Sequence, residues 1–549
     1  MSQTGPKRIN LWMPLLFSII LIVGMFVGYR LRDSGSFKRS ISSIIQSEDR
    51  LEEMISLINN RYVDPIEEED LYQNAIGGIV KTLDPHSFYI NSADLAQTND
   101  NLNGSYKGLG IEFNIHNDTL VVISMVKGGP AEKSRIEIGD QIIALNTDII
   151  AGLGLTNDLI KSKLKNIDSD TINLAVKRLS EPGILDLQLV KSNVPFYSLD
   201  AHYMLTPSVG YIRINRFSAT TFDEFYQSLL ELKSEGMTQL VLDLRQNPGG
   251  FVDAAIGILD EFFGKDKLLL TVNGKTFEKN EYISTGKGDF ENGEVIVLVD
   301  ESSASASEII AGALQDWDRG VVLGRRTFGK GLVQEQFEMN DGSALRLTVA
   351  RYYTPSGRSI QKKIGNNDAN FESDDEAQIN TMLTGNYSTI PDEESNKYYT
   401  LEHQRTIYGG GGIKPDIFVP YESYLLSNDL WHVINGINDY VYTYFSQNVQ
   451  SLTKYKIISD FEKEYQVSES MMSKFKQEAL QKFPASANSV WKNKDQIRYL
   501  KLLMKANIAR LLFRNDGYYH VLNIQDPLVK EALVLFETNK YKEILKINK

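Results

Sequence analysis

The sequence predicts a multidomain α/β protein whose last part is helical. Its 549 residues, 42% of them hydrophobic, exceed what one hydrophobic core usually holds. Strand-like and helical patterns alternate from Val209 to Phe263 and again from Val295 onward, which is typical of a sheet covered by helices. From Tyr421 to Lys549 the apolar residues keep helical spacing. We therefore expect several domains around a layered α/β core.

Composition excludes several classes of function. The formal net charge of −13 argues against nucleic-acid binding, because a surface that binds phosphates normally carries a basic excess. The absence of cysteine excludes disulfides, zinc–thiolate sites and cysteine nucleophiles. None of the six histidines forms an HExxH motif or a closely spaced ligand pair. We therefore expect no metal and no other cofactor.

The first 30 residues have the pattern of a membrane anchor or signal segment. An apolar run from about Ile9 to Tyr29 follows Lys7 and Arg8 and is long enough to cross a bilayer as one helix. A cleavable signal peptide is the alternative, but no Ala-x-Ala-like site follows the run. Basic residues on both sides leave the orientation open. We expect one uncleaved helix that anchors the protein, with its bulk in the periplasm or outside the cytoplasmic membrane.

The segment 31–103 is expected to be an N-terminal helical region. Pro65 and Pro85 interrupt its pattern, and a turn histidine, His86, more plausibly binds backbone groups than serves catalysis. The apolar residues with helical spacing are Leu51, Met54, Ile55 and Ile58, then Leu71, Ala75, Ile76 and Ile79.

The segment 104–192 changes to short strands and one helix. It contains Gly-Leu-Gly at 108–110 before an alternating strand, Gly-Pro-Ala-Glu at 129–132 and Ile-Gly-Asp-Gln-Ile at 138–142. Such a turn can point successive N–H groups at a carboxylate, and a strand edge beside it can pair with a peptide. The segment resembles a PDZ domain, although the glycines could also simply form a tight hairpin. The predicted carboxylate-binding residues are Gly108, Leu109, Gly110 and Ile111.

The segment 193–420 carries the candidate chemistry. A buried strand from Leu240 to Leu244 leads into the turn 247–250, Asn-Pro-Gly-Gly. Glycines there would let a backbone N–H approach a ligand, but the same four residues also make an ordinary good turn. The polar stretch 362–404 is interpreted as a surface insertion or loop.

A cluster of serines follows the apolar run from Val295 to Val299. It brings Ser303, Ser305 and Ser307 to the start of a helical pattern, where unpaired N–H groups favour negative charge and can serve as oxyanion donors. Ser305 with Glu308 also matches a capping box, and capping alone would explain this serine.

A lysine between two glycines supports a catalytic interpretation. Lys330 stands in an apolar neighbourhood, and a buried, neutral amine can take a proton from serine. Gln334, four positions later, would lie on the same face of a strand and could orient the amine. No Gly-x-Ser-x-Gly elbow occurs and no histidine lies near the cluster. From residue chemistry alone, a serine–lysine hydrolase and a structural cap with a surface lysine remain equally open.

The motifs taken together resemble the carboxyl-terminal processing proteases, also called tail-specific proteases. These motifs are SASASE, TFGKGLVQ, DLRQNPGG and LDPHS with the PDZ-like unit, and the resemblance covers about Leu51 to Pro420. It implies a crotonase-like protease core at 193–420 with Ser305 as nucleophile, Lys330 as base and Gln334 as its orienting residue. It also implies backbone oxyanion donors at Gly249 or Gly250 and at Ala306.

The function implied is a serine endopeptidase that cleaves proteins near or from their C-terminal tails, with the PDZ domain capturing the substrate's C-terminus. The alternative is a non-catalytic PDZ scaffold with an inert protease-like core. The segment 421–549 is expected to be a separate C-terminal helical domain without chemistry of its own, through which the chain could form a homo-oligomer.

Overall fold

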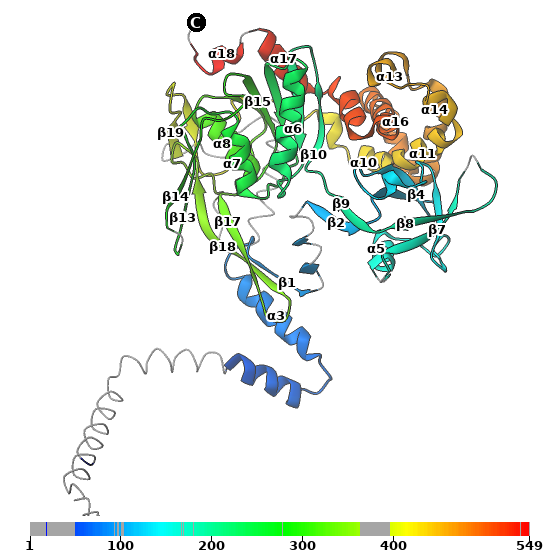
Figure 1. Ribbon diagram of the computed structural model, residues 1–549, viewed down its shortest axis with the longest axis horizontal. Coiled ribbons are helices and arrows are strands. Elements are labelled where there is room, and N and C mark those ends of the chain that lie inside the picture. The colour runs from blue at the N-terminus through cyan, green and yellow to red at the C-terminus, as the bar shows by residue number, and fades with distance from the viewer. Residues whose placement is uncertain are drawn as a thin grey trace, which may run out of the picture. The chain divides into compact units, whose positions relative to one another are not determined.

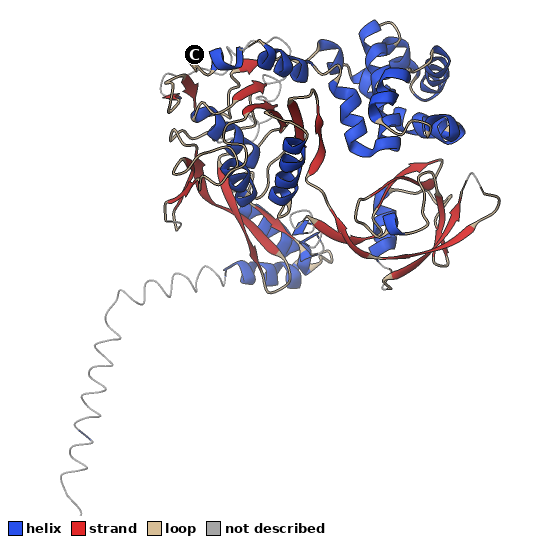
Figure 2. Cartoon of the chain, turned by 45° about the horizontal axis from the view of Figure 1, so that its top comes forward, coloured by secondary structure: helices blue, strands red, loops and turns tan. Residues whose placement is uncertain are grey.

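The computed structural model describes most of the chain (Figure 1 and Figure 2). By their contacts the residues fall into two compact units, Met1–Tyr89 and Ile90–Lys549, and each is described by itself. The described residues are Ser18, 50–92, Asp94, Leu95, Thr98, Asn99, 104–165, Ile167, 169–178, 181–276, 278–362, 396–538 and 540–547.

In the part of the first unit that the structure describes beyond Ser18, two helices follow one another along the chain. One covers residues 50–61 and the other is α3 (Glu68–Val80). Pro65 lies between them, and a proline has no N–H with which to continue a helix. Three acidic residues occupy the first turn of α3, where negative charge complements the unpaired N–H groups.

The structure does not support the predicted membrane anchor. A membrane-spanning helix needs about 20 consecutive apolar residues, and no helix among the described residues is long and apolar enough. Apart from Ser18, the apolar run from about Ile9 to Tyr29 lies outside the described residues. The prediction of a single N-terminal anchoring helix is therefore wrong. The predicted location outside the cytoplasmic membrane depended on that anchor and is not supported either.

The second unit begins with a small antiparallel sheet and one helix. The strand order is β3-β4-β5-β7-β8, with β6 paired to β5. Buried and exposed residues alternate along β7, as expected for a strand with one face on a core. A shorter pair, β2 and β9, joins the two ends of the segment. The elements are β2 (Ser105–Gly108), β3 (Ile111–His116), β4 (Thr119–Met125), β5 (Gln141–Leu145), β6 (Asp148–Ile149), α5 (Asn157–Lys165), β7 (Thr171–Lys177), β8 (Leu185–Val190) and β9 (Ser192–Pro195).

A six-stranded sheet forms the centre of the next segment. The strand order is β10-β11-β12-β15-β16-β21, and all neighbours are parallel except β10 and β11. The strands are β10 (Leu199–Met204), β11 (Val209–Ile214), β12 (Gln239–Asp243), β15 (Glu294–Val299), β16 (Val321–Gly324) and β21 (Ile417–Phe418).

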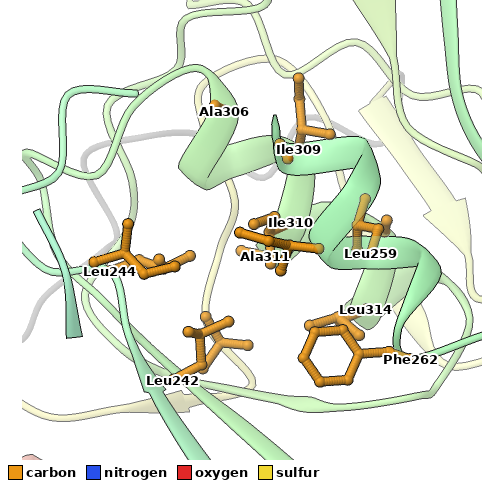
Figure 3. Packing of buried hydrophobic residues seen from close by; sticks show 14 of the residues in the cluster. Leu242, Leu244, Leu259, Phe262, Ala306, Ile309, Ile310, Ala311 and Leu314 are labelled. Carbon is orange, nitrogen blue, oxygen red and sulfur yellow. The ribbon is translucent and has the colours of Figure 1, made fainter. Parts of the chain in front are cut away.

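Three helices cover one face of this sheet (Figure 1). They are α6 (Thr221–Ser234), α7 (Val252–Asp260) and α8 (Ala306–Asp316), and they share one buried cluster with the sheet. Every residue of α8 is buried. Figure 3 shows Ile310 of this helix among side chains that include Leu242, Leu244 and Leu259. The packing therefore fixes the place where α8 begins.

The C-terminal end of the chain covers the opposite face. Helices α17 (Pro527–Glu537) and α18 (Lys540–Ile544) pack on β12, β15 and β16, with Leu528 and Leu535 in the same cluster as Val241. Burial of both faces explains why these strands appear in the sequence as continuous apolar runs without alternation. The multidomain α/β fold is confirmed.

A second sheet is antiparallel and carries the strand that follows Lys330. The long strand β18 pairs with both β17 and β13, and β14 pairs with β13. Residues 363–395 of the predicted insertion lie outside the described residues. The strands are β13 (Leu268–Gly274), β14 (Asn280–Ile283), β17 (Leu332–Glu338) and β18 (Ala344–Tyr353), and a separate pair is formed by β19 (Lys397–Tyr399) and β20 (Thr406–Tyr408).

A set of helices after the core encloses a hydrophobic cluster of its own. The longest, α16, contains Arg514 in a non-helical conformation with φ 61°, so it is kinked there. Assembly of several copies through these helices stays a prediction. The helices are α10 (Asn428–Ile434), α11 (Ile437–Gln447), α12 (Val449–Leu452), α13 (Ile458–Glu464), α14 (Glu469–Lys482), α15 (Pro484–Val490) and α16 (Lys494–Asn523).

Buried charges meet at the end of β12. The carboxylate of Asp243 is fully buried and accepts hydrogen bonds from Arg245 (2.6 Å), Arg213 (2.9 Å) and the Tyr211 hydroxyl (2.7 Å). Burial alone would raise the pKa of Asp243, but the charges of Arg245 and Arg213 outweigh it and hold that pKa well below its usual range. Arg245 also pairs with Asp526, just before α17, at 2.7 Å. The network therefore ties the turn after β12 to the C-terminal helices.

Replacing Asp243 by asparagine should destabilise the core, because Arg213 and Arg245 would each lose a buried carboxylate partner. Breaking a buried ion pair costs about 3–5 kcal/mol, or roughly 6–20 °C in melting temperature for a domain of this size. Because the pKa of Asp243 is lowered in the folded protein, its contribution is present at neutral pH and is lost as pH falls below about 4. Circular dichroism melts of both proteins at pH 7 and at lower pH would measure this.

The matched control is Asp223→Asn, which changes an exposed carboxylate on α6 and should leave the melting temperature nearly unchanged. Equal melting temperatures for Asp243→Asn and the wild type at pH 7 would contradict the importance of the network.

Candidate active site

Ser305 lies at the junction between the central sheet and α8. β15 ends at Val299 and α8 begins at Ala306, so Ser305 is the last residue before the helix. Its backbone has φ 53° and ψ −112°, an unfavourable conformation for a residue with a side chain, costing on the order of 1–3 kcal/mol. Such strain is maintained only where the surroundings impose it, and it is concentrated at functional sites.

The three candidate serines have different environments. The Ser303 hydroxyl donates to the Leu244 carbonyl at 2.8 Å, and the Ser307 hydroxyl donates to the Asn247 carbonyl at 3.0 Å. Both side chains are fully buried, so they attach the serine cluster to the end of β12. Ser305 is half-buried. Of the three, Ser305 alone is open enough to meet a substrate.

The carboxylate of Glu308 joins the serine and the lysine segments. One of its oxygens accepts the N–H of Ser305 and the N–H of Lys330, each at 2.9 Å. The other accepts the N–H of Gly329 at 2.7 Å and the Thr327 hydroxyl at 2.6 Å. Burial raises the pKa of Glu308, and these four hydrogen bonds oppose the rise. Glu308 thus binds the Ser305 N–H as the predicted capping box requires. The same carboxylate also binds the segment that carries Lys330.

Lys330 and Gln334 are in contact. The Lys330 ammonium donates to the Gln334 side-chain oxygen at 3.0 Å, and both residues are half-buried. Lys330 precedes β17, and a β-bulge lies between Val333 and Gln334, so simple alternation along a strand does not produce this contact. The irregular strand brings the two side chains together nevertheless.

The Asn-Pro-Gly-Gly turn packs directly against the serine segment. A Cβ atom on Gly249 would lie 2.7 Å from the Ser305 Cβ and 2.9 Å from the Ala306 nitrogen, and one on Gly250 would lie 1.9 Å from the Phe217 oxygen. Both glycines have positive φ angles, 93° and 146°. Only glycine fits at these positions.

The two glycines differ in whether their N–H groups are already bonded. The Gly249 N–H donates to the Asn247 side-chain oxygen at 2.9 Å. In the part of the chain that the structure describes, neither the Gly250 N–H nor the Ala306 N–H donates to another residue. Gly250 and Ala306 are therefore the better candidates for oxyanion donors, and Gly249 supports the turn.

The predicted carboxylate-binding turn, residues 108–111, lines a groove of about 650 Å³ between β3 and α5. Among the described strands β3 pairs with β4 alone, so its other edge is open to an added strand. The groove is lined largely by apolar side chains, among them Leu109, Ile111, Phe113, Ile160 and Leu164.

One residue of the site, Tyr352, could not be predicted from the sequence. The Tyr352 hydroxyl donates to the Lys330 carbonyl at 2.5 Å and lies 3.1 Å from the Ser305 carbonyl. Tyr352 and Tyr353 are adjacent in the apolar strand β18, and the pattern alone does not distinguish them. The capping-box spacing did point to Glu308, but only as a partner of Ser305.

Four parts of the chain match known families. Residues 208–370 match peptidase family S41 and residues 108–189 match the PDZ domain. Residues 26–94 match the N-terminal domain of the activating protease CtpB. Residues 434–515 match DUF8443, a family of unknown function.

Relatives with known names match more than half of the chain. The carboxy-terminal processing protease CtpB of Bacillus subtilis is 34% identical over 320 residues, 57% of this chain and 66%, just under two thirds, of that protein. The carboxy-terminal-processing protease of Bartonella bacilliformis is 34% identical over 317 residues, 57% of this chain and 72% of that protein. The solved photosystem II D1 C-terminal processing protease is 26% identical, covering 57% of this chain and 89% of its own, with a TM-score of 0.33. By its sequence relatives and its peptidase and PDZ segments, this chain belongs to the carboxy-terminal processing proteases of peptidase family S41, and it is a serine-type peptidase.

Proposed function

We propose that this peptidase is an endopeptidase that uses Ser305 as nucleophile and Lys330 as general base, with Gln334 orienting the amine. One observation carries the proposal: the N–H groups of Ser305 and Lys330 bind the same oxygen of the buried Glu308 carboxylate. A nucleophile and its base must be held close together to exchange a proton, and this shared partner holds the two backbones.

The reaction would proceed by acyl transfer. Ser305 Oγ attacks the peptide carbonyl while Lys330 Nζ takes its proton. The N–H groups of Gly250 and Ala306 donate to the oxyanion that forms. The protonated amine then supplies a proton to the leaving nitrogen, and water releases the acyl group from Ser305.

Selection of the substrate is assigned to the PDZ segment. The turn 108–111 would bind the terminal carboxylate, the open edge of β3 would pair with the peptide backbone, and the groove beside α5 would take an apolar terminal side chain. The substrates are therefore proteins with accessible C-terminal tails that end in apolar residues.

Separate Ser305→Ala and Lys330→Arg substitutions should each lower the cleavage of a flexible, apolar-tailed protein by a factor on the order of 10⁴ or more. Arginine keeps the positive charge but cannot act as a base. Time courses by gel electrophoresis measure cleavage, and mass spectrometry of a fluorophosphonate adduct measures the reactivity of Ser305. Ser302→Ala, which removes an exposed hydroxyl from the same loop, is the control and should stay active. An active Ser305→Ala protein would refute the proposal. If the wild type binds tail peptides but Ser305 does not react with the fluorophosphonate, the protein is a non-catalytic scaffold.

The role of Gln334 is tested by the pH dependence of the rate. In Gln334→Glu a negative charge replaces the neutral amide that lies 3.0 Å from the amine, and an opposite charge favours the protonated amine. The rising limb of kcat/KM against pH should therefore move to higher pH, whereas Gln334→Met should lower kcat without such a shift. Glu338→Gln, at an exposed position of the same strand, should reproduce the wild-type profile. An unshifted profile in Gln334→Glu would remove Gln334 from the proposed mechanism.

Capture of a C-terminus by the PDZ segment is tested with two fluorescent decapeptides that end in the same apolar residues, one with a free carboxylate and one amidated. Hydrogen bonds to a charged group contribute about 1.5–3 kcal/mol, so amidation should weaken binding about tenfold or more in anisotropy titrations. Leu164→Asp, which puts a charge into the groove, should abolish the preference. Leu153→Asp, at an exposed position, should not. Equal affinity for both peptides would exclude carboxylate recognition.

A further inference from the structure

The backbones of the proposed nucleophile and base share two hydrogen-bond partners. Their two N–H groups bind one oxygen of Glu308, each at 2.9 Å. Their two carbonyl oxygens both face the hydroxyl of Tyr352, which lies 2.5 Å from the Lys330 oxygen and 3.1 Å from the Ser305 oxygen. Residues 25 positions apart in the sequence are thus held by one carboxylate and one phenol.

The single proton of the Tyr352 hydroxyl goes mainly to Lys330. Its distance to the Lys330 carbonyl is the shorter of the two, and the Ser305 carbonyl already accepts the N–H groups of Glu308 and Ile309 at 2.8 and 2.9 Å. Burial first, and then the charge of Glu308, raise the pKa of Tyr352 well above its usual value. The phenol therefore stays a hydrogen-bond donor at neutral pH.

The ring of Tyr352 is itself fixed. The residue lies in β18, is 1% exposed, pairs with Val272 of β13 and donates its own N–H to the Gly331 carbonyl at 3.1 Å. Lys330, in contrast, stands between Gly329 and Gly331, and glycines restrict the backbone least. A lysine in such a loop needs outside contacts to hold its peptide groups in place.

We propose that Tyr352 is a positioning residue for catalysis: its hydroxyl fixes the Lys330 peptide group against the start of α8 and so holds the amine in reach of Ser305. The inference rests on the proposed serine–lysine dyad and adds a residue to it. Tyr352 is buried away from solvent, and its effect passes through Lys330. Loss of the hydroxyl removes the donor that binds the Lys330 carbonyl, and a displacement of about 1 Å at a reacting group lowers the rate by up to about a hundredfold.

The test compares Tyr352→Phe with the matched control Tyr353→Phe, a half-exposed neighbour on the same strand. For Tyr352→Phe, kcat and the rate of Ser305 labelling by a fluorophosphonate should both fall by about 10- to 100-fold, while KM and tail-peptide affinity change less than about twofold. Tyr353→Phe should match the wild type. A purely structural role would lower the melting temperature and leave the labelling rate unchanged well below it.

A wild-type labelling rate in the folded Tyr352→Phe protein overturns this inference and leaves the proposed dyad standing. Absence of any Ser305 labelling in the wild type overturns the proposed function, and this inference with it. If Tyr352→Phe melts below the assay temperature, Tyr352→4-fluorophenylalanine fills the space of the hydroxyl without donating, and Tyr352→3-fluorotyrosine keeps the donor. Slow labelling of Ser305 in the 4-fluorophenylalanine variant, with near wild-type labelling in the 3-fluorotyrosine variant, supports the inference. Equal labelling rates in the two variants overturn it.

Discussion

The buried carboxylate of Glu308 is the interaction on which the rest of the site depends. It accepts hydrogen bonds from the serine segment and from the lysine loop at the same time. Burial of a charged group without such partners would be unfavourable by several kcal/mol, so the four donors and the carboxylate require one another. Since both segments lose a partner if either moves, they hold one arrangement. The strained backbone of Ser305 is maintained within this arrangement.

The layered core places this carboxylate where it can act. α8 is buried along its whole length between the sheet and α7, so its first turn cannot shift relative to the end of β12. The glycine turn after β12 then approaches the serine so closely that a side chain on Gly249 would collide with it. Arg245, between β12 and this turn, is held by Asp243 and by Asp526. Helices from the far end of the chain thereby support the turn that carries the proposed oxyanion donor.

Binding and chemistry are assigned to different kinds of structure in this chain. The PDZ segment presents an open strand edge and an apolar groove, which suit extended peptides of varied sequence because the contacts are made largely to backbone. The peptidase segment presents a half-buried serine and lysine whose backbones are fixed by buried side chains. A tail-processing protease needs both properties, because it must accept many tails and still align one peptide bond with its nucleophile.

Local patterns were enough to predict the fold class and the PDZ segment, because apolar periodicity and motif spacing are properties of short stretches of chain. The serine–lysine pair stays a prediction, which came from the resemblance of the motifs to a family. Residue chemistry alone did not choose among Ser303, Ser305 and Ser307 as the nucleophile, which only the resemblance did, and it did not show that the Gly249 N–H is already bonded. The apolar N-terminal run predicted an anchor that the described structure does not support. Only the tertiary structure brought Tyr352 to Lys330 and placed α17 on the back of the sheet. These contacts join segments far apart in the sequence, and which distant groups meet is decided by how the strands and helices are connected and packed.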